Sequence, residues 1–179
     1  MAIEIEKKFV LSNDQREQVL ENLNKFGAKL VGENLEENTL YSGGILMEKR
    51  AVLRVRKIGE KTILTYKQRI ENDSDFKQQI EYETVVEKAK QMEKIIESLG
   101  FEKTLVYEKR RQTWHFRAVE IVLDELPFGQ YMEIEGSVTA IAEAEMLLDV
   151  ENLTIENETY PHLTRRFGVQ KEKLIEARF

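Results

Sequence analysis

Charged and apolar residues alternate along many short segments of this chain, and this alternation is the strongest constraint on its fold. The opening segment MAIEIEKKFVL puts Glu4, Glu6 and Lys8 on one side and apolar residues on the other. Side chains of a β-strand point alternately to the two faces of a sheet, so a period of two predicts strands with one charged and one apolar face. The predicted strands are the opening segment and residues 29–41, 51–58, 61–69, 77–84, 102–117, 119–125 and 131–136.

The charges on several of these strands have a single sign. Arg54 and Arg56 share the charged face of AVLRVRK, whereas Glu133 and Glu135 share the charged face of YMEIEGS. The remaining strand charges that share a face in this way are Lys67, Glu81, Glu83, Lys109, Arg111, Glu120 and Asp124. The pattern therefore separates acidic strands from basic ones.

Amphipathic helices are predicted at residues 12–27, 86–99 and 139–149, with short helical turns from Pro161 onward. The two glycines at 43–44 are expected in a turn. The segments KIGEKT and RAVE favour hairpin connections between neighbouring strands. Much of the sheet should therefore be antiparallel.

The predicted helices need an apolar surface to cover, and the apolar strand faces supply it. If the sheet closes on itself, the charged faces must line its interior. We therefore expect an α+β fold, an eight-stranded antiparallel closed β-barrel with flanking helices, in a single domain over residues 1–179. The alternative is an open sheet whose charged face is solvated and carries cross-strand ion pairs.

A closed barrel with a charged interior is costly when it is empty. Two like charges ~5 Å apart repel by roughly 3 kcal/mol even at an effective dielectric constant near 20. Grouped carboxylates are relieved by a hard divalent cation such as Mg²⁺ or Mn²⁺, and grouped Arg and Lys side chains are relieved by phosphate oxygens. A metal-bound polyphosphate would satisfy both groups.

The composition disfavours several other functions. The 33 acidic residues outnumber the 27 Lys and Arg residues, and the net charge of −6 argues against a nucleic-acid or membrane partner. The chain has no cysteine, no P-loop motif and no long apolar segment, which fits a cytoplasmic protein. His115 and His162 are expected to be structural or solvated. Exposed apolar helix faces would be compatible with a homodimer.

The ordered set of charged motifs resembles the CYTH family, which is named after class IV adenylyl cyclases and thiamine triphosphatases. The opening EIEKK matches the Glu-x-Glu-x-Lys motif of this family. The other segments that carry the resemblance are LRVRK, LTYKQ, IEYE, EKRR, VLDELPFGQYMEIEG and ETYPHLT. The resemblance covers most of the chain, to about residue 167, and implies an eight-stranded triphosphate tunnel, a triphosphate substrate and a divalent metal.

The resemblance also implies roles for individual residues. The implied metal ligands, or members of their outer shell, are Glu4, Glu6, Asp124, Glu133 and Glu135. The implied phosphate clamp consists of Lys8, Arg54, Arg56, Lys109 and Arg111. Glu81 and Glu83 would orient the basic residues of the substrate site. Tyr41 and Lys67 occupy places similar to those of the Tyr–Lys pair that assists water attack in thiamine triphosphatase-like members.

The function that this pattern favours is Mg²⁺- or Mn²⁺-dependent hydrolysis of a phosphoanhydride bond in a small-molecule triphosphate. Inorganic triphosphate, thiamine triphosphate and a nucleoside triphosphate stay open as substrates. One alternative is a class IV adenylyl cyclase that converts ATP to cyclic AMP and pyrophosphate, since both reactions can use the same clamp. A second alternative is a non-enzymatic polyphosphate- or nucleotide-binding module, although such a module would not need to keep both the acids and the bases.

Overall fold

Eight strands of the protein close into an antiparallel β-barrel. The computed structural model describes residues 2–70 and 77–179, and the side chains of residues 5–70 and 78–179. The barrel strands are β1 (Ala2–Leu11), β2 (Lys29–Ser42), β3 (Ala51–Ile58), β4 (Lys61–Ile70), β5 (Lys77–Val85), β6 (Glu102–Phe116), β7 (Val119–Leu126) and β8 (Gly129–Glu135). Their order around the barrel is β2-β3-β4-β5-β1-β8-β7-β6, and pairing of β6 with β2 closes the ring. The predicted closed barrel is confirmed.

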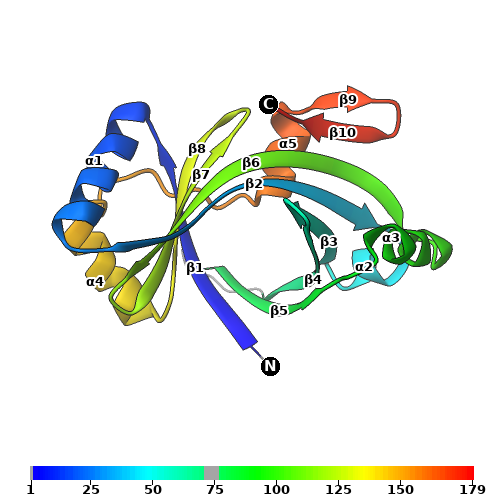
Figure 1. The fold of residues 1–179 in the computed structure, drawn as a ribbon, viewed down its shortest axis with the longest axis horizontal. Coiled ribbons are helices and arrows are strands. Elements are labelled where there is room, and N and C mark those ends of the chain that lie inside the picture. The colour runs from blue at the N-terminus through cyan, green and yellow to red at the C-terminus, as the bar shows by residue number, and fades with distance from the viewer. Residues whose placement is uncertain (1, 71–76) are drawn as a thin grey trace.

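Helices cover the outside of the barrel on two sides (Figure 1). The helices α1 (Asn13–Lys25) and α4 (Val138–Leu148) pack on the apolar outer faces of β1, β6, β7 and β8. The core between them includes Phe9, Leu23 and Ile121, each of which is fully buried. On the other side, α3 (Ala89–Ser98) covers outward-facing residues of β2 and β3. The apolar strand faces are therefore the outer faces, as the alternation predicts.

The ends of α1 follow from local chemistry. The Ser12 side chain accepts a hydrogen bond from the Gln15 backbone, and the Gln15 side chain accepts one from the Ser12 backbone. This reciprocal pair satisfies two of the amide groups that a helix N-terminus leaves free. Gly27 follows the helix with φ +75°, a left-handed conformation that glycine adopts at low cost. No described helix is long and apolar enough to cross a membrane.

Two sequence-based expectations are corrected by the structure. The glycines at 43–44 do not form a simple turn but begin a short helix, α2 (Gly44–Glu48), with Gly43 as its N-cap at φ +129°. The segment from Pro161 contains one complete helix, α5 (Tyr160–Phe167), followed by the strands β9 (Val169–Lys171) and β10 (Leu174–Ala177). β10 pairs in parallel with residues 105–107 of β6, beyond the stretch of β6 that β7 covers.

An apolar cluster fills the barrel interior next to α5 and β10. Inward-facing Leu40, Tyr107 and Leu126 pack against Tyr160 and Leu163 of α5. Figure 1 shows α5, β9 and β10 together at one end of the barrel. This end of the interior is therefore apolar and packed, whereas charged residues occupy the remainder.

The core under α1 should dominate the stability of the fold. Leu23 is fully buried there, whereas Leu35 on β2 is 56% exposed. We expect Leu23→Ala to lower the free energy of unfolding by about 2–5 kcal/mol, since it removes buried methyl groups and leaves a cavity. The matched Leu35→Ala should change it by ~0.5 kcal/mol or less. Urea denaturation followed by circular dichroism measures both values, and equal losses would contradict this core assignment.

Candidate functional site

The barrel encloses a cavity of about 350 Å³ that is lined mainly by charged side chains. Among the described residues, six cations and six carboxylates line it. The cations are Lys8, Arg54, Arg56, Lys67, Lys109 and Arg111. The carboxylates are Glu6, Glu81, Glu83, Glu120, Glu133 and Glu135. The structure thus brings charged residues from seven strands to one site, which an open solvated sheet would not do.

The strand order separates these charges into two walls. β3 and β6 flank β2, and they carry Arg54, Arg56, Lys109 and Arg111; we call these four residues the basic wall. β1 is four strands from β2 in either direction around the barrel, so it faces β2 across the interior.

Three glutamates form the opposite wall. Glu6 of β1 lies directly opposite Glu135 of β8, which in turn lies opposite Glu120 of β7. We call these three residues the acidic wall. The sequence pattern placed Glu120 on a charged face, but only the register brings it next to the other two.

Asp124 anchors the basic wall from behind. The Arg111 Nε and Nη2 atoms donate to the two oxygens of Asp124 at 2.7 and 2.5 Å. Lys109 Nζ lies 3.3 Å from Asp124 Oδ2, and the Tyr160 hydroxyl donates to the same oxygen at 2.8 Å. Asp124 is completely buried, so these groups replace water as its partners.

The environment of the basic wall sets its protonation. Burial is the largest effect on Lys109 and, together with the charge of Arg111, lowers the pKa of Lys109 to about 8 despite Asp124, Glu36 and Glu133. Burial also acts to lower the pKa of Arg111, but Asp124, together with Glu36 and Glu133, outweighs it and raises that pKa well above the ordinary value. The guanidinium is therefore a fixed charge, whereas the ammonium group can titrate near neutral pH.

Lys8 is held at the junction of the two walls. Its Nζ atom lies 3.3 Å from Glu133 Oε1 and donates to the backbone oxygen of Glu158 at 3.1 Å. The same atom lies 3.9 Å from the centre of the Tyr160 ring, a cation–π contact. Glu133 also accepts a hydrogen bond from Arg111 at 2.9 Å, so it links two cations.

The carboxylates of β5 lie beside the cations of β3 and β4. Glu81 Oε2 is 2.7 Å from Lys67 Nζ, and Glu81 Oε1 is 3.9 Å from Arg54 Nη2. Glu83 lies 4.0 Å from Arg54 and 3.9 Å from Arg56. Both positions fit carboxylates that orient basic side chains.

The structure places two predicted site residues away from the cavity. Tyr41 points to the outer side of β2, where it packs with Val55 and Ile96 under α3. A Tyr41–Lys67 pair is therefore not assembled, and the predicted role of Tyr41 is wrong for this geometry. Asp124 faces inward but does not line the cavity, because cations and Tyr160 occupy its oxygens; its role as a metal ligand or as a member of the outer shell stays a prediction.

One predicted metal ligand lies outside the described side chains, and two functional candidates were missed by sequence reasoning. Glu4 pairs with Gln79 through the backbone of β1, but its side chain is outside the described residues. Glu36 contacts Arg56 and Lys109 of the basic wall, and its register opposite Lys109 is the signal that would have identified it. Tyr160 belongs to the ETYPHLT segment, and its ring on α5 contacts the ammonium groups of Lys8 and Lys109.

The acidic wall has the donor chemistry for a divalent cation. Among the described residues, no three carboxylates converge closely enough to form a metal-ligand group by themselves. Mg²⁺ is usually bound through one or two carboxylates together with substrate phosphates, rather than by a complete protein cage. Glu6 and Glu135, which are directly opposed on neighbouring strands, fit that arrangement.

A model of the CYTH domain family matches residues 2–162. The chain belongs to the CYTH family. A Methanocaldococcus jannaschii protein named "putative adenylate cyclase" is 28% identical over 152 residues, which cover 82% of this chain and 84% of that protein.

Solved structures share the fold. The PH1012 protein from Pyrococcus horikoshii OT3 is 24% identical with a TM-score of 0.78, covering 89% of this chain and 98% of that one. HpAC1 from Hippeastrum, described as a "putative adenylyl cyclase" with a dominant triphosphatase activity, is 16% identical with a TM-score of 0.72, covering 95% and 98% of the two chains. At these identities the similarity establishes the fold alone. The charged cavity is established from the side chains of this protein.

The lowered pKa of Lys109 predicts a pH dependence of anion binding. Lys109 loses its charge as the pH rises through about 8, whereas an ordinary lysine stays charged to ~10.4. We expect the affinity for inorganic triphosphate to weaken between about pH 7 and pH 9.5, because one clamp charge is lost. Lys109→Arg keeps its charge and should bind with nearly constant affinity over this range. Titration calorimetry tests both proteins; a wild-type affinity that tracks the variant at every pH would contradict the assignment.

Proposed function

We propose that this protein is a divalent-metal-dependent enzyme that hydrolyses a phosphoanhydride bond of a small-molecule triphosphate. The observation that carries the proposal is the separation of charge within one cavity, with a basic wall facing an acidic wall. A metal-bound triphosphate matches both walls, since its phosphate oxygens suit Arg and Lys and its metal suits carboxylates.

The basic wall would bind and polarise the phosphate chain. Arg54 and Arg56 each offer a planar set of donors that can contact phosphate oxygens in pairs. The Nε and Nη2 atoms of Arg111 already donate to Asp124, so Arg111 would contact phosphate through Nη1. In the reaction they would stabilise the negative charge that develops on the transferred phosphoryl group. Asp124 and Glu133 would hold Lys109 and Arg111 in place, rather than bind the metal.

Glu6 and Glu135 would hold the divalent metal, with Glu120 next to them in register. A bound Mg²⁺ or Mn²⁺ would supply a Lewis acid that neutralises phosphate charge and lowers the pKa of a bound water. The carboxylates of the chain would fix the side of the cavity on which the metal-coordinated end of the substrate lies.

Lys67 would act at the reacting end of the substrate, as the resemblance to thiamine triphosphatase-like members implies, but with Glu81 as its partner instead of Tyr41. Its ion pair with Glu81 at 2.7 Å fixes the position of its ammonium group in the cavity. The ammonium group could orient a water by donating to its oxygen, and the Glu81 carboxylate could accept the proton that the water loses.

Adenylyl cyclase activity is the second candidate. It is supported by the name of the Methanocaldococcus jannaschii relative and by a less polar part of the cavity wall. Leu40, Val52 and Pro161 lie there beside Tyr107, where an adenine ring could pack. The described activity of HpAC1 supports testing hydrolysis first, since that member of the same fold is described with dominant triphosphatase activity.

A product assay separates the two reactions. With Mg²⁺ or Mn²⁺, we expect the wild type to release phosphate from inorganic triphosphate faster than it forms cyclic AMP from ATP. Arg56→Ala should lower the rate of phosphate release at least tenfold, because it removes a charge-assisted phosphate contact worth roughly 1.5–3 kcal/mol. The control is Arg110→Ala, whose side chain is exposed and pairs with Glu125 at 3.2 Å. Cyclic AMP formation without phosphate release would overturn the hydrolase proposal, and neither product would support the binding-module alternative.

The metal assignment predicts a change in metal requirement. Glu6→Gln and Glu135→Gln keep the side-chain shape but remove an anionic oxygen ligand, so the Mg²⁺ concentration for half-maximal activity should rise about tenfold or more, which corresponds to ~1.4 kcal/mol. Glu125→Gln, at an exposed glutamate paired with Arg110, should leave this concentration unchanged. Titration of activity with Mg²⁺ measures it. An unchanged requirement in both acidic-wall variants would rule out these two ligands.

A further inference from the structure

Glu36 is a buried acid that the proposed reaction leaves without a role. It lies on β2, the strand between the two strands of the basic wall, and its side chain is 2% exposed. Glu36 Oε2 lies 3.5 Å from Lys109 Nζ and 3.8 Å from Arg56 Nε. That oxygen has no hydrogen-bond partner within the described residues, so its contacts are those of a charge among cations.

The placement of Glu36 is fixed by both neighbouring strands. It lies directly opposite Lys109 in the pairing of β2 with β6, and Arg56 extends toward it from β3. Arg56 and Lys109 come from strands that do not pair with each other. Among the described side chains, Glu36 alone lies within ion-pair distance of both of these cations.

The cations of the basic wall repel one another when no anion is bound. Burial alone would raise the pKa of Glu36, but Lys109, Arg111, Arg56 and Arg54 outweigh it and lower this pKa to about 2. Glu36 therefore stays ionised in the empty cavity and supplies one negative charge at the centre of four positive ones. The attractions of Glu36 to Lys109 and Arg56, at 3.5 and 3.8 Å, are stronger inside the protein than they would be in bulk water, because the effective dielectric constant is lower there.

Glu36 does not line the cavity, and a carboxylate would repel a phosphate. It therefore contacts the cations from behind and leaves the sides that face the cavity free for substrate. We propose that Glu36 is a positioning residue, an internal counter-charge that holds Arg56 and Lys109 together in the empty site so that both present their donors to the same phosphate chain. This inference rests on the proposed function of the basic wall as a phosphate clamp.

A counter-charge differs from an ordinary buried side chain in its response to ligand. When Glu36 is neutralised, the empty basic wall loses its internal anion, and a bound polyphosphate replaces part of that charge. The folded variant should therefore bind the polyphosphate more tightly than the folded wild type does. A ligand that binds the folded state raises the stability of that state by an amount that grows with its affinity, so the polyphosphate should stabilise the variant more.

Thermal unfolding with inorganic triphosphate and without metal tests this response. Glu36→Gln neutralises the acid at constant shape, and Glu37→Gln is the matched control on the opposite face of the strand, where Glu37 pairs with Arg178 at 2.7 Å. We expect Glu36→Gln to melt below the wild type and to gain about 3 °C more than the wild type from saturating inorganic triphosphate. Glu37→Gln should show the same ligand shift as the wild type.

Kinetics provide a second readout. Since Glu36 aligns the clamp but does not touch the substrate, Glu36→Gln should lower kcat about tenfold and leave KM for inorganic triphosphate unchanged or lower. Glu36→Asp keeps the charge one methylene further from the cations and should recover part of kcat. A buried residue with only a packing role would give no rescue by aspartate and no change in the ligand shift.

The outcomes separate this inference from the proposed function. If inorganic triphosphate fails to stabilise the wild type, the clamp itself is wrong. If it stabilises the wild type and Glu36→Gln by the same number of degrees, the clamp stands and the role of Glu36 is overturned. If Glu36→Gln does not fold under either condition, Glu36→Asp decides, since a kcat no higher than that of Arg56→Ala, despite the retained charge, would overturn the role.

Discussion

The buried carboxylate of Asp124 is the group on which the charged interior most depends. It accepts both hydrogen bonds of the Arg111 fork, lies 3.3 Å from Lys109 and accepts the Tyr160 hydroxyl. These contacts tie β6, β7 and α5 together around one negative charge that has no contact with water. Breaking a buried ion pair by removing one partner typically costs 3–5 kcal/mol, because the other charge is left uncompensated. Asp124 thus allows cations to be concentrated inside a small barrel, and it places Tyr160 under them.

Closure of the barrel turns a simple strand pattern into a site. Because side chains alternate with a period of two, a shift of one residue in register would move every inward charge to the outer face under the helices. The outer faces of β1, β6, β7 and β8 pack with α1 and α4, so the hydrophobic effect fixes which face is outside. The charged face then has no place except the interior. The stability of the helical layer and the geometry of the cavity are therefore two consequences of one constraint.

The sequence predicts the barrel and most cavity residues. Along β3, β5, β6 and β8, charges of one sign recur at every second residue, so they mark the face of each strand that points into the cavity. It fails at β2, where residues on both faces are buried near Tyr41: the barrel interior lies on one side and α3 on the other. Hydropathy cannot separate inward from outward residues in such a stretch. The segment GENLEEN also carries acids on both faces, so Glu36 is recognised only from its register with Lys109. β10 was missed because it pairs with β6 through a contact of long sequence separation, and local pattern does not encode such contacts.

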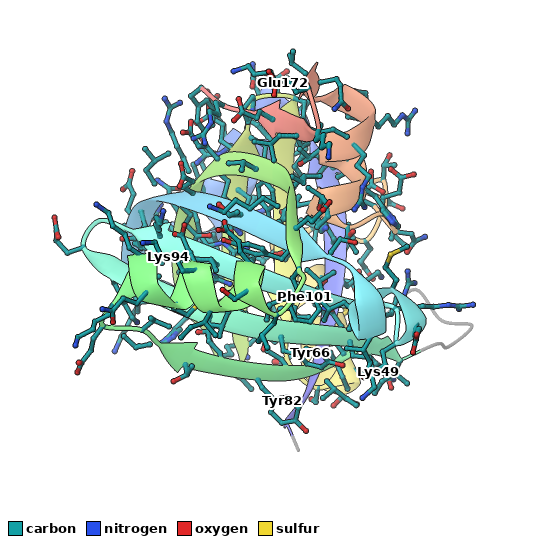
Figure 2. All side chains as sticks on the ribbon, turned by 90° about the vertical axis from the view of Figure 1, so that its right-hand side faces the viewer. Lys49, Tyr66, Tyr82, Lys94, Phe101 and Glu172 are labelled. Atoms are coloured by element: carbon teal, nitrogen blue, oxygen red, sulfur yellow. The ribbon has the colours of Figure 1, made fainter. Side chains whose placement is uncertain are left out.

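The outward-facing and inward-facing residues of β4 and β5 differ in chemistry. Tyr66 and Tyr82 lie together outside β4 and β5, with ring centres 6.2 Å apart and ring planes inclined by 28° (Figure 2). The inward residues of the same two strands, Lys67 and Glu81, form an ion pair instead. Neighbouring positions on one pair of strands thus serve packing outside and charge placement inside. In the proposed reaction, a metal held by Glu6 and Glu135 would also attract the triphosphate that the basic wall binds. Each ligand would therefore favour binding of the other by the same factor, since coupling between two binding sites is reciprocal.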